Sequence, residues 1–198
     1  MRIALGMALC SLLMAGVTIA ETKEIIMVEM VTSEGTMKLE LYPEKAPVTV
    51  SNFLAYVDSG FYEGTIFHRV IQDFMIQGGG FDEDLNRKST EDPIKNEAAN
   101  GLRNERGTIA MARTQIPDSA TSQFFINSSD NPALDYRNDS PQGIGYCVFG
   151  RVVEGEEVID RIQSARTESR GGMQDVPQTT ITIEKVTRLD DSAGDAEE

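Results

Sequence analysis

The sequence predicts a mainly β protein, folded as a closed antiparallel β-barrel or as a β-sandwich, with two helices. Many short apolar runs are separated by turn residues along the chain. Some of these runs alternate apolar and polar residues, with the period of two that marks a half-buried strand. Only two segments carry apolar residues at helical spacing. Many short strands with few helices are typical of all-β barrels and sandwiches.

The first two strands are predicted over residues 25–31 (IIMVEMV) and 36–42 (TMKLELY). In the second run, Met37, Leu39 and Leu41 fall on one face, and polar side chains fall on the other. The sequence Ser-Glu-Gly at residues 33–35 lies between the runs and predicts a hairpin turn.

The two helices are predicted over residues 47–59 and 155–165. Apolar residues recur at helical spacing in both segments: Val50, Phe53, Leu54 and Val57 in the first, and Val158, Ile159 and Ile162 in the second. Pro47 suits a first helical turn, and Gly60 suits a helix end.

Further short apolar runs predict the remaining strands, over residues 65–71, 74–77, 108–112, 123–127, 147–153 and 180–187. Two long irregular segments separate some of them, at residues 82–106 and 128–145. Loops of that length are uncommon unless they have a function. We therefore expect both segments to have a function.

The two ends of the chain differ from the rest. Residues 1–20 carry one charge, at Arg2, then an apolar run and a small-residue ending, which predicts a signal peptide cleaved after Ala20. A retained membrane anchor is the alternative, although the run is short for a spanning helix. Residues 21–189 then form one domain. Residues 190–198 are acidic and rich in small residues, which predicts a disordered tail.

Charge and cysteine content exclude several classes of function. The chain has 18 basic and 32 acidic residues, and loss of Arg2 with the leader changes the net charge from −14 to −15. Nucleic acid would be repelled by this charge. Only Cys147 remains after leader removal, so no internal disulfide can form. Its apolar surroundings indicate a small buried hydrophobe rather than a nucleophile.

The single histidine, His68, limits the possible chemistry further. A two-histidine metal site is impossible, and no carboxylates have metal-ligand spacing, so we expect no metal and no cofactor. A serine triad would require His68, but the chain lacks a G-x-S-x-G motif. The run Gly78-Gly79-Gly80 lacks a nucleotide-binding pattern and indicates a turn or close backbone packing.

Two of the predicted strands offer a polar and apolar surface. In a regular strand His68 and Arg69 point to opposite faces, so one of them is structural, and we assign that role to His68. Met75 and Gln77 share a face, as do Gln123 and Phe125. If the strands are neighbours, these side chains and Arg69 form one site. Core residues with a snorkelling arginine are an equal alternative on composition alone.

Four sequence blocks resolve this choice. FHRVIQDFMIQGGGF at residues 67–81, followed by IAMART, SQFFIN and YCVFGRV, resembles the cyclophilin family of peptidyl-prolyl cis/trans isomerases. The resemblance runs from about residue 28 to 186, and IKNEAANGLRNERGTIAMART is most similar to single-domain periplasmic cyclophilins of Gram-negative bacteria. It implies an eight-stranded antiparallel barrel capped by two helices, with no metal or cofactor.

The resemblance also implies a role for individual residues. Arg69 matches the catalytic arginine, and Gln77 matches the glutamine that orients it. The walls of the proline pocket match Phe74, Met75, Phe125, Leu134 and, in place of a histidine, Tyr146. Further substrate contacts match His68, Ala112, Arg113 and Gln123. If Phe74 and its neighbour Met75 both line the pocket, the chain must bend between them.

Two other departures from the animal members of the family affect binding. Ala133 stands where they have a tryptophan, so weak cyclosporin binding is expected. Arg113 replaces an asparagine that works through its backbone. Neither departure removes Arg69 or the pocket, so catalysis is expected to survive.

The resemblance implies proline-containing, unfolded or partly folded polypeptides as partners, with no nucleic acid and no membrane after leader removal. We expect a monomeric isomerase that assists the folding of exported proteins in the periplasm. The eukaryotic secretory pathway would also accept this leader, and Asn127 and Asn138 begin glycosylation patterns. A proline-binding module without turnover and a hydrolase using His68 are the alternative functions.

Overall fold

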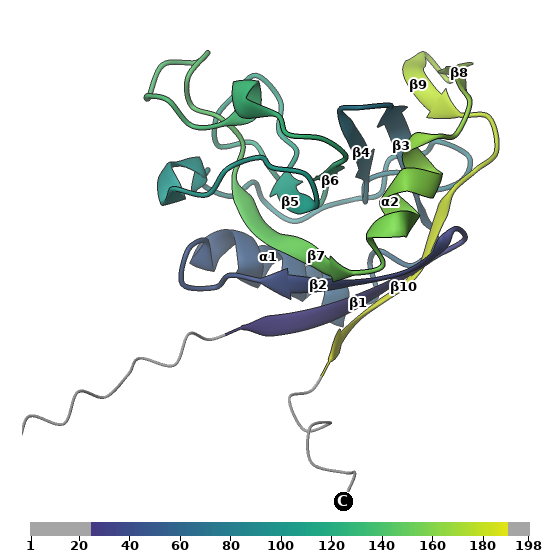
Figure 1. Ribbon diagram of the computed structural model, residues 1–198, viewed down its shortest axis with the longest axis horizontal. Helices are drawn as coiled ribbons and strands as arrows, with labels where there is room; N and C mark the ends of the chain where they lie inside the picture. Colours follow the sequence, from purple (N-terminus) through teal and green to yellow (C-terminus); the bar gives the residue numbers. More distant parts are fainter. Residues whose placement is uncertain (1–24, 190–198) are drawn as a thin grey trace, which may run out of the picture.

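The computed structural model describes residues 25–189 of the chain. Eight strands close into an antiparallel barrel in the order β1-β10-β3-β4-β6-β5-β7-β2 (Figure 1). These strands are β1 (Ile26–Thr32), β2 (Gly35–Leu41), β3 (Thr65–Ile71), β4 (Met75–Gly78), β5 (Thr108–Met111), β6 (Phe124–Asn127), β7 (Val148–Glu154) and β10 (Thr182–Leu189). The barrel is confirmed, and the sandwich alternative is excluded.

The apolar residues that alternate with polar ones in the second predicted strand line the barrel interior. Met37, Leu39 and Leu41 of β2 are fully buried, and the facing strands add further apolar side chains to one large core. The predicted hairpin also forms, since β1 pairs with β2 from Ile26 and Leu41 to Thr32 and Gly35. Burial of this continuous apolar core is the main source of stability for such a barrel.

Two α-helices cover the core with their apolar faces. The first, α1 (Pro47–Asp58), begins at a proline and packs against β10. The second, α2 (Glu156–Gln163), follows Gly155 in the left-handed conformation and packs against β2, β3 and β4. Figure 1 shows the two helices on different sides of the barrel. Both lie where the sequence predicts them, each one to three residues shorter.

A separate two-stranded sheet was not predicted. It consists of β8 (Thr167–Arg170) and β9 (Met173–Pro177), joined by a turn at Gly171 and Gly172, which both have positive φ. Strand β9 packs against β3, and the hairpin projects beyond the barrel (Figure 1). An added Cβ on Gly171 would lie 2.8 Å from the Leu85 side chain, so the hairpin tip also touches the long loop after β4.

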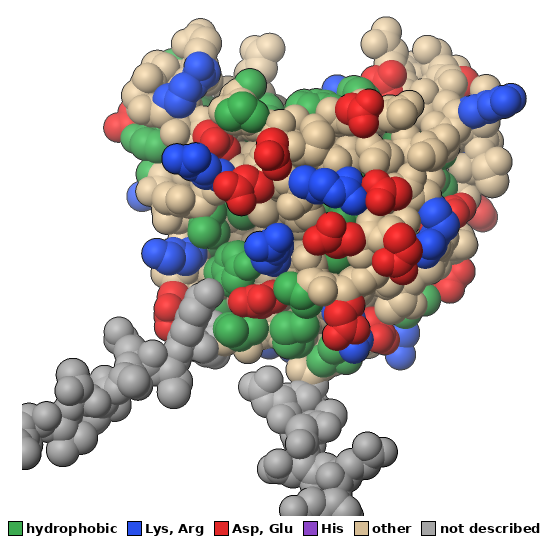
Figure 2. All heavy atoms as spheres, viewed as in Figure 1, with side chains coloured by type: hydrophobic (Ala, Val, Ile, Leu, Met, Phe, Trp, Pro, Cys, Tyr) green, Lys and Arg blue, Asp and Glu red, His purple; other side chains and the backbone are tan. Residues whose placement is uncertain are grey.

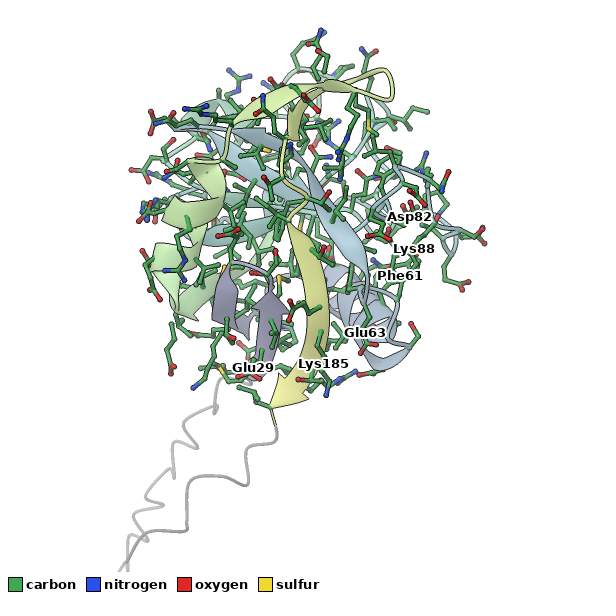
Figure 3. All side chains as sticks on the ribbon, turned by 90° about the vertical axis from the view of Figure 1, so that its right-hand side faces the viewer. Glu29, Phe61, Glu63, Asp82, Lys88 and Lys185 are labelled. Atoms are coloured by element: carbon green, nitrogen blue, oxygen red, sulfur yellow. The ribbon has the colours of Figure 1, made fainter. Side chains whose placement is uncertain are left out.

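The two long irregular segments lack strands of the barrel but contain short 3-10 helices, η1 (Ala98–Asn100) and η2 (Pro132–Leu134). Local hydrogen bonds order the first segment, because Asp82 accepts from the backbone N–H groups of Asp84 and Asn86. Lys88 donates to the carbonyl of Phe61 and lies 4.6 Å from the centre of its ring (Figure 3).

The described chain begins and ends on neighbouring strands, β1 and β10 (Figure 1). The predicted signal peptide (1–20) and acidic tail (190–198) lie outside the described residues. No helix between residues 25 and 189 is long and apolar enough to cross a membrane. On the face drawn in Figure 2, acidic and basic side chains are interspersed.

Candidate active site

Four neighbouring strands bring three of the predicted site residues, together with Ala110, into one row across the outer face of the barrel. Arg69 on β3 pairs with Gln77 on β4, Gln77 pairs with Phe125 on β6, and Phe125 pairs with Ala110 on β5. Phe124 and Ile126, on either side of Phe125, belong to the interior core. Because neighbours in a strand point to opposite faces, this row faces outward.

The expectation that His68 and Arg69 lie on opposite faces is wrong. The register of β3 against β4 shifts between Phe67 and Arg69, so His68 is an extra residue in the strand. Such a bulge breaks the alternation of faces. Phe67 and Val70 both reach the interior core, while His68 and Arg69 line one cavity on the outside.

An apolar pocket of about 110 Å³ lies over this row. Its lining is Arg69, Phe74, Met75, Gln77, Ala112, Arg113, Phe125, Leu134 and Tyr146, which are nine of the eleven predicted site residues. The chain bends before β4, where Phe74 lies in a turn and Asp73 has a φ of 55°. This bend lets Phe74 and Met75 line the same pocket, as the prediction required.

A chain of polar contacts runs along one edge of the pocket. The Gln77 amide donates to Oε1 of Gln123 over 3.0 Å, which leaves its own Oε1 to accept from Nη1 of Arg69 over 3.4 Å. On the other side of the guanidinium, Oδ2 of Asp175 lies 3.9 Å from Nε of Arg69. The Arg69 side chain remains 41 % exposed, so its charge is oriented yet reachable from the pocket.

The site thus combines an oriented cation with a small apolar pocket. Comparisons with known proteins identify the family to which the chain belongs. The family model described as cyclophilin type peptidyl-prolyl cis-trans isomerase/CLD matches residues 27–188. The chain belongs to the cyclophilin family. It is accordingly a peptidyl-prolyl cis-trans isomerase.

Similar proteins support this assignment over nearly their full length. The chain is 59 % identical over 157 residues to peptidyl-prolyl cis-trans isomerase cyp18 of Streptomyces antibioticus, covering 79 % of this chain and 95 % of that protein. It is 55 % identical over 161 residues to peptidyl-prolyl cis-trans isomerase B of Escherichia coli (strain K12), covering 81 % and 98 %. The chain is also similar to a Cryptosporidium parvum cyclophilin, with a TM-score of 0.71 and 29 % identity. The match covers 83 % of this chain and 99 % of that chain, whose crystal structure was solved in the presence of the dipeptide Ala-Pro.

The two remaining predicted residues lie just outside the apolar pocket. Gln123 lines a neighbouring cavity of about 130 Å³ together with Gln77, Ala112 and Arg113. His68 lines a different cavity on the far side of Arg69. The cyclophilin site of this chain is therefore a pocket with cavities around it, rather than a single hollow.

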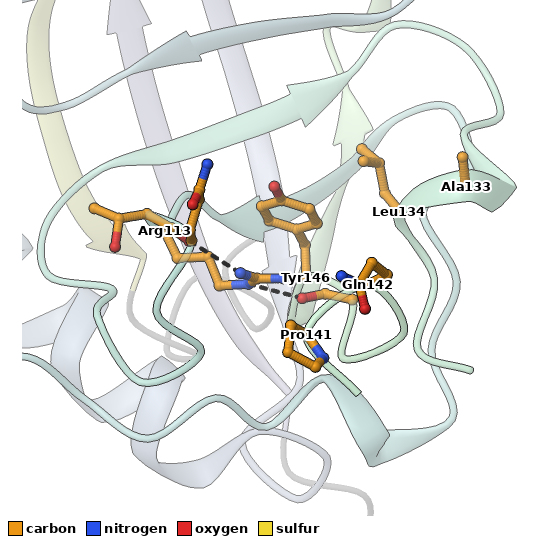
Figure 4. A pocket seen from close by; sticks show the side chains of 9 residues that line it. Arg113, Ala133, Leu134, Pro141, Gln142 and Tyr146 are labelled. Atoms are coloured by element: carbon orange, nitrogen blue, oxygen red, sulfur yellow. Dashed lines mark hydrogen bonds between the residues drawn. The ribbon is translucent and has the colours of Figure 1, made fainter. Parts of the chain in front are cut away.

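Arg113 and Tyr146 fill one wall together. The Arg113 guanidinium lies 4.5 Å from the centre of the Tyr146 ring, and its Nε donates to the Gly145 carbonyl over 2.9 Å. Tyr146 meets the Phe125 ring edge-on at 5.7 Å. Figure 4 shows both residues beside a larger cavity of about 690 Å³, whose lining also includes Ala133, Pro141 and Gln142. The Arg113 side chain is thus held against Tyr146 and forms part of the pocket lining.

The environment of His68 argues against the hydrolase alternative. Burial is the main cause that lowers the pKa of His68 to about 4, and the charge of Arg69 lowers it further, against a hydrogen bond to the Ile66 backbone. Within residues 25–189, Nδ1 of His68 has no hydrogen-bond partner, so no hydroxyl or thiol nucleophile is paired with that nitrogen. Burial likewise raises the pKa of the Cys147 thiol to about 11, and nucleophilic attack requires the thiolate.

The glycine run after β4 fits the packing interpretation and yields a test. A Cβ on Gly80 would lie 2.4 Å from Cγ of Gln123, which only a displaced Gln123 side chain could accommodate. Gly80→Ala is therefore expected to release Gln77 and to lower kcat/KM for an X–Pro peptide on the order of tenfold, because orientation of the catalytic group is lost.

A double variant provides the control for the Gly80 prediction. Gln123→Ala removes the clashing side chain, so adding Gly80→Ala to it should cost no further activity. Unchanged kcat/KM in a folded Gly80→Ala single variant would show that the chain of contacts from Gln123 to Arg69 does not matter for turnover.

Sequence reasoning missed the contribution of β9 to this site. Met173, Gln174 and Asp175 line one cavity together with His68 and Arg69. Their segment shows no clear apolar alternation. The Gly171-Gly172 pair was the one available signal, because two glycines between short runs indicate a tight hairpin.

Proposed function

We propose that Arg69 is the catalytic residue of this isomerase, and that Gln77 positions it. The observation that carries the proposal is the chain of contacts from Gln123 through Gln77 to Arg69 at the edge of an apolar pocket. Phe74, Met75, Phe125, Leu134 and Tyr146 supply the walls for a proline ring.

The reaction needs only the loss of amide resonance. Rotation about a peptide bond has a barrier of roughly 18–20 kcal/mol because the C–N bond has partial double-bond character. In the twisted state the prolyl nitrogen regains its lone pair, and a cationic donor close to it stabilises that state. Arginine is permanently charged and offers a planar fork of donors. A pocket that excludes water strengthens this interaction.

An assay with and without Arg69 tests the proposal. Isomerisation of an X–Pro peptide, followed by a coupled protease, should be accelerated by the protein and far less by Arg69→Ala. A pure proline-binding module would retain the peptide in both forms and accelerate neither. Binding without acceleration by the folded wild-type protein would favour that alternative.

The pH dependence of turnover distinguishes this mechanism from acid–base catalysis. No proton is transferred in the proposed step, and His68 has a pKa of about 4. We expect kcat/KM to vary by less than about twofold between pH 6 and pH 9, since a bell-shaped profile requires an essential acid or base. A bell with its acid limb near neutrality would return His68 to the mechanism.

We further propose that the clients are exported proteins, that the enzyme acts in the periplasm, and that it works as a monomer with weak affinity for cyclosporin. The leader pattern of residues 1–20 supports export. Expression of the full chain in a Gram-negative host, followed by fractionation and mass measurement, tests export and leader cleavage. A periplasmic product beginning at Glu21 is expected, and an uncleaved, membrane-bound product would contradict the proposal.

A further inference from the structure

A second cavity, of about 430 Å³, continues the site beyond Arg69. It lies between β3 and the β8–β9 hairpin, and its lining consists of His68, Arg69, Phe81, Gln123, Met173, Gln174 and Asp175. Arg69 lines both this cavity and the apolar pocket. A polypeptide whose proline occupies the pocket can therefore place another residue in the cavity.

His68 gives this cavity an unused hydrogen-bonding group. The side chain is 4 % exposed, its ring centre lies 4.6 Å from that of Phe81, and among the described residues its Nδ1 has no partner. Buried polar atoms in proteins are nearly always paired, so an unpaired one indicates a missing partner. A neutral imidazole either donates or accepts at Nδ1, depending on its tautomer. A peptide backbone offers a partner for both cases.

The strand order and the predicted place of the residue before proline together give the direction of the bound chain. The paired row runs from β5 through β6 and β4 to β3, and β9 packs on the far side of β3. Under the proposed function, the residue before proline binds at Ala112 and Arg113, which follow β5. The chain then crosses the pocket and leaves over Arg69, toward the cavity.

The lining favours one class of side chain. Phe81 and Met173 offer apolar surface for a long aliphatic stem, on which such side chains pack while their charged end stays in water. Asp175 places a carboxylate at the rim, 39 % exposed, and Arg69 is its one ionic partner within the described part of the chain. This carboxylate lies 3.9 Å from Nε of Arg69, which is too far for a hydrogen bond, so it has an oxygen to offer a cation from the substrate.

We propose that this cavity is a subsite for the residue that follows proline, and that Asp175 makes it prefer lysine or arginine. The proposal rests on the proposed function and specifies which clients the same site selects. His68 holds the backbone of that residue, and Phe81 and Met173 hold its aliphatic stem.

A peptide series isolates the charge. Three peptides share one Ala-Pro bond and carry lysine, norleucine or glutamate after the proline, and their exchange rates are measured by NMR, without a coupling protease. We expect kcat/KM to be about threefold higher for lysine than for norleucine, as for a partly exposed ion pair, and lowest for glutamate. Asp175→Asn should abolish the difference between lysine and norleucine.

A matched variant controls for net charge. Glu63→Gln also removes one carboxylate, but Glu63 lies far from the hairpin, near the other end of the barrel (Figure 3), so the lysine preference should persist. Equal rates for lysine and norleucine with the wild-type enzyme, or a preference that survives Asp175→Asn, would overturn the subsite. Either result would leave the isomerase itself intact, whereas no acceleration of any peptide would refute the proposed function.

A second variant tests the role of His68. His68→Phe keeps an aromatic ring against Phe81 but removes the nitrogen. It should raise KM more for peptides that extend past the proline than for a peptide that ends in prolinamide. An equal loss for both peptides would indicate a general structural defect and contradict the subsite.

Discussion

Replacement of Arg69 by alanine is expected to lower kcat/KM for X–Pro peptides by roughly a hundred- to a thousandfold, the effect of removing one preorganised donor from a transition state. Stability should change little, because the side chain is 41 % exposed and lies on the outer face of the barrel. The loss should fall on kcat rather than KM, since the apolar walls that hold the proline remain.

Arg69→Lys is the informative companion variant. It retains a positive charge but replaces a planar fork of donors by a single flexible ammonium, and these two groups are not interchangeable at an oriented site. We expect activity between that of wild type and Arg69→Ala. Circular dichroism and thermal unfolding would verify that both variants are folded. Near-wild-type kcat in a folded Arg69→Ala protein would contradict the role assigned to this residue.

The barrel interior was predictable because it depends on local alternation. Met37, Leu39 and Leu41 are buried as their period of two requires. Closure of the sheet was not predictable in this way. It depends on pairings between strands distant in sequence, such as β1 with β10, and periodicity carries no information about such partners. Patterning alone therefore left barrel and sandwich equal, and only the family resemblance separated them.

The candidate site also contains features that could be predicted from the sequence and features that could not. Residues within the long sequence blocks, such as Gln77 and Phe125, were placed correctly beside each other. Two features were missed or misjudged because each departs from regular alternation. One is the bulge that brings His68 to the same side as Arg69, and the other is the short hairpin that carries Asp175. Bulges and tight hairpins depend on register, which one strand's sequence does not specify.

The buried position of His68 predicts that the stability of the fold depends on pH. Burial lowers the pKa of His68 from an ordinary value of 6.5 to about 4 in the folded protein. Between these values the unfolded chain binds more protons than the folded chain does. The contribution of His68 to stability is therefore fully present above about pH 6.5 and is lost as the pH falls toward 4. A shift of this size corresponds to about 3 kcal/mol in the free energy of unfolding.

Comparison with His68→Phe isolates this contribution from the titration of the carboxylates. Urea unfolding at pH 7 and at pH 4 should show a larger loss of stability for the wild type than for the variant, by about 3 kcal/mol. Parallel pH dependence in the two proteins would mean that His68 titrates alike in the folded and unfolded states. A neutral His68 also matters for the site, because a protonated imidazole next to Arg69 in β3 would place a second positive charge beside the guanidinium. Keeping that imidazole neutral leaves Arg69 as the cation that faces the prolyl amide.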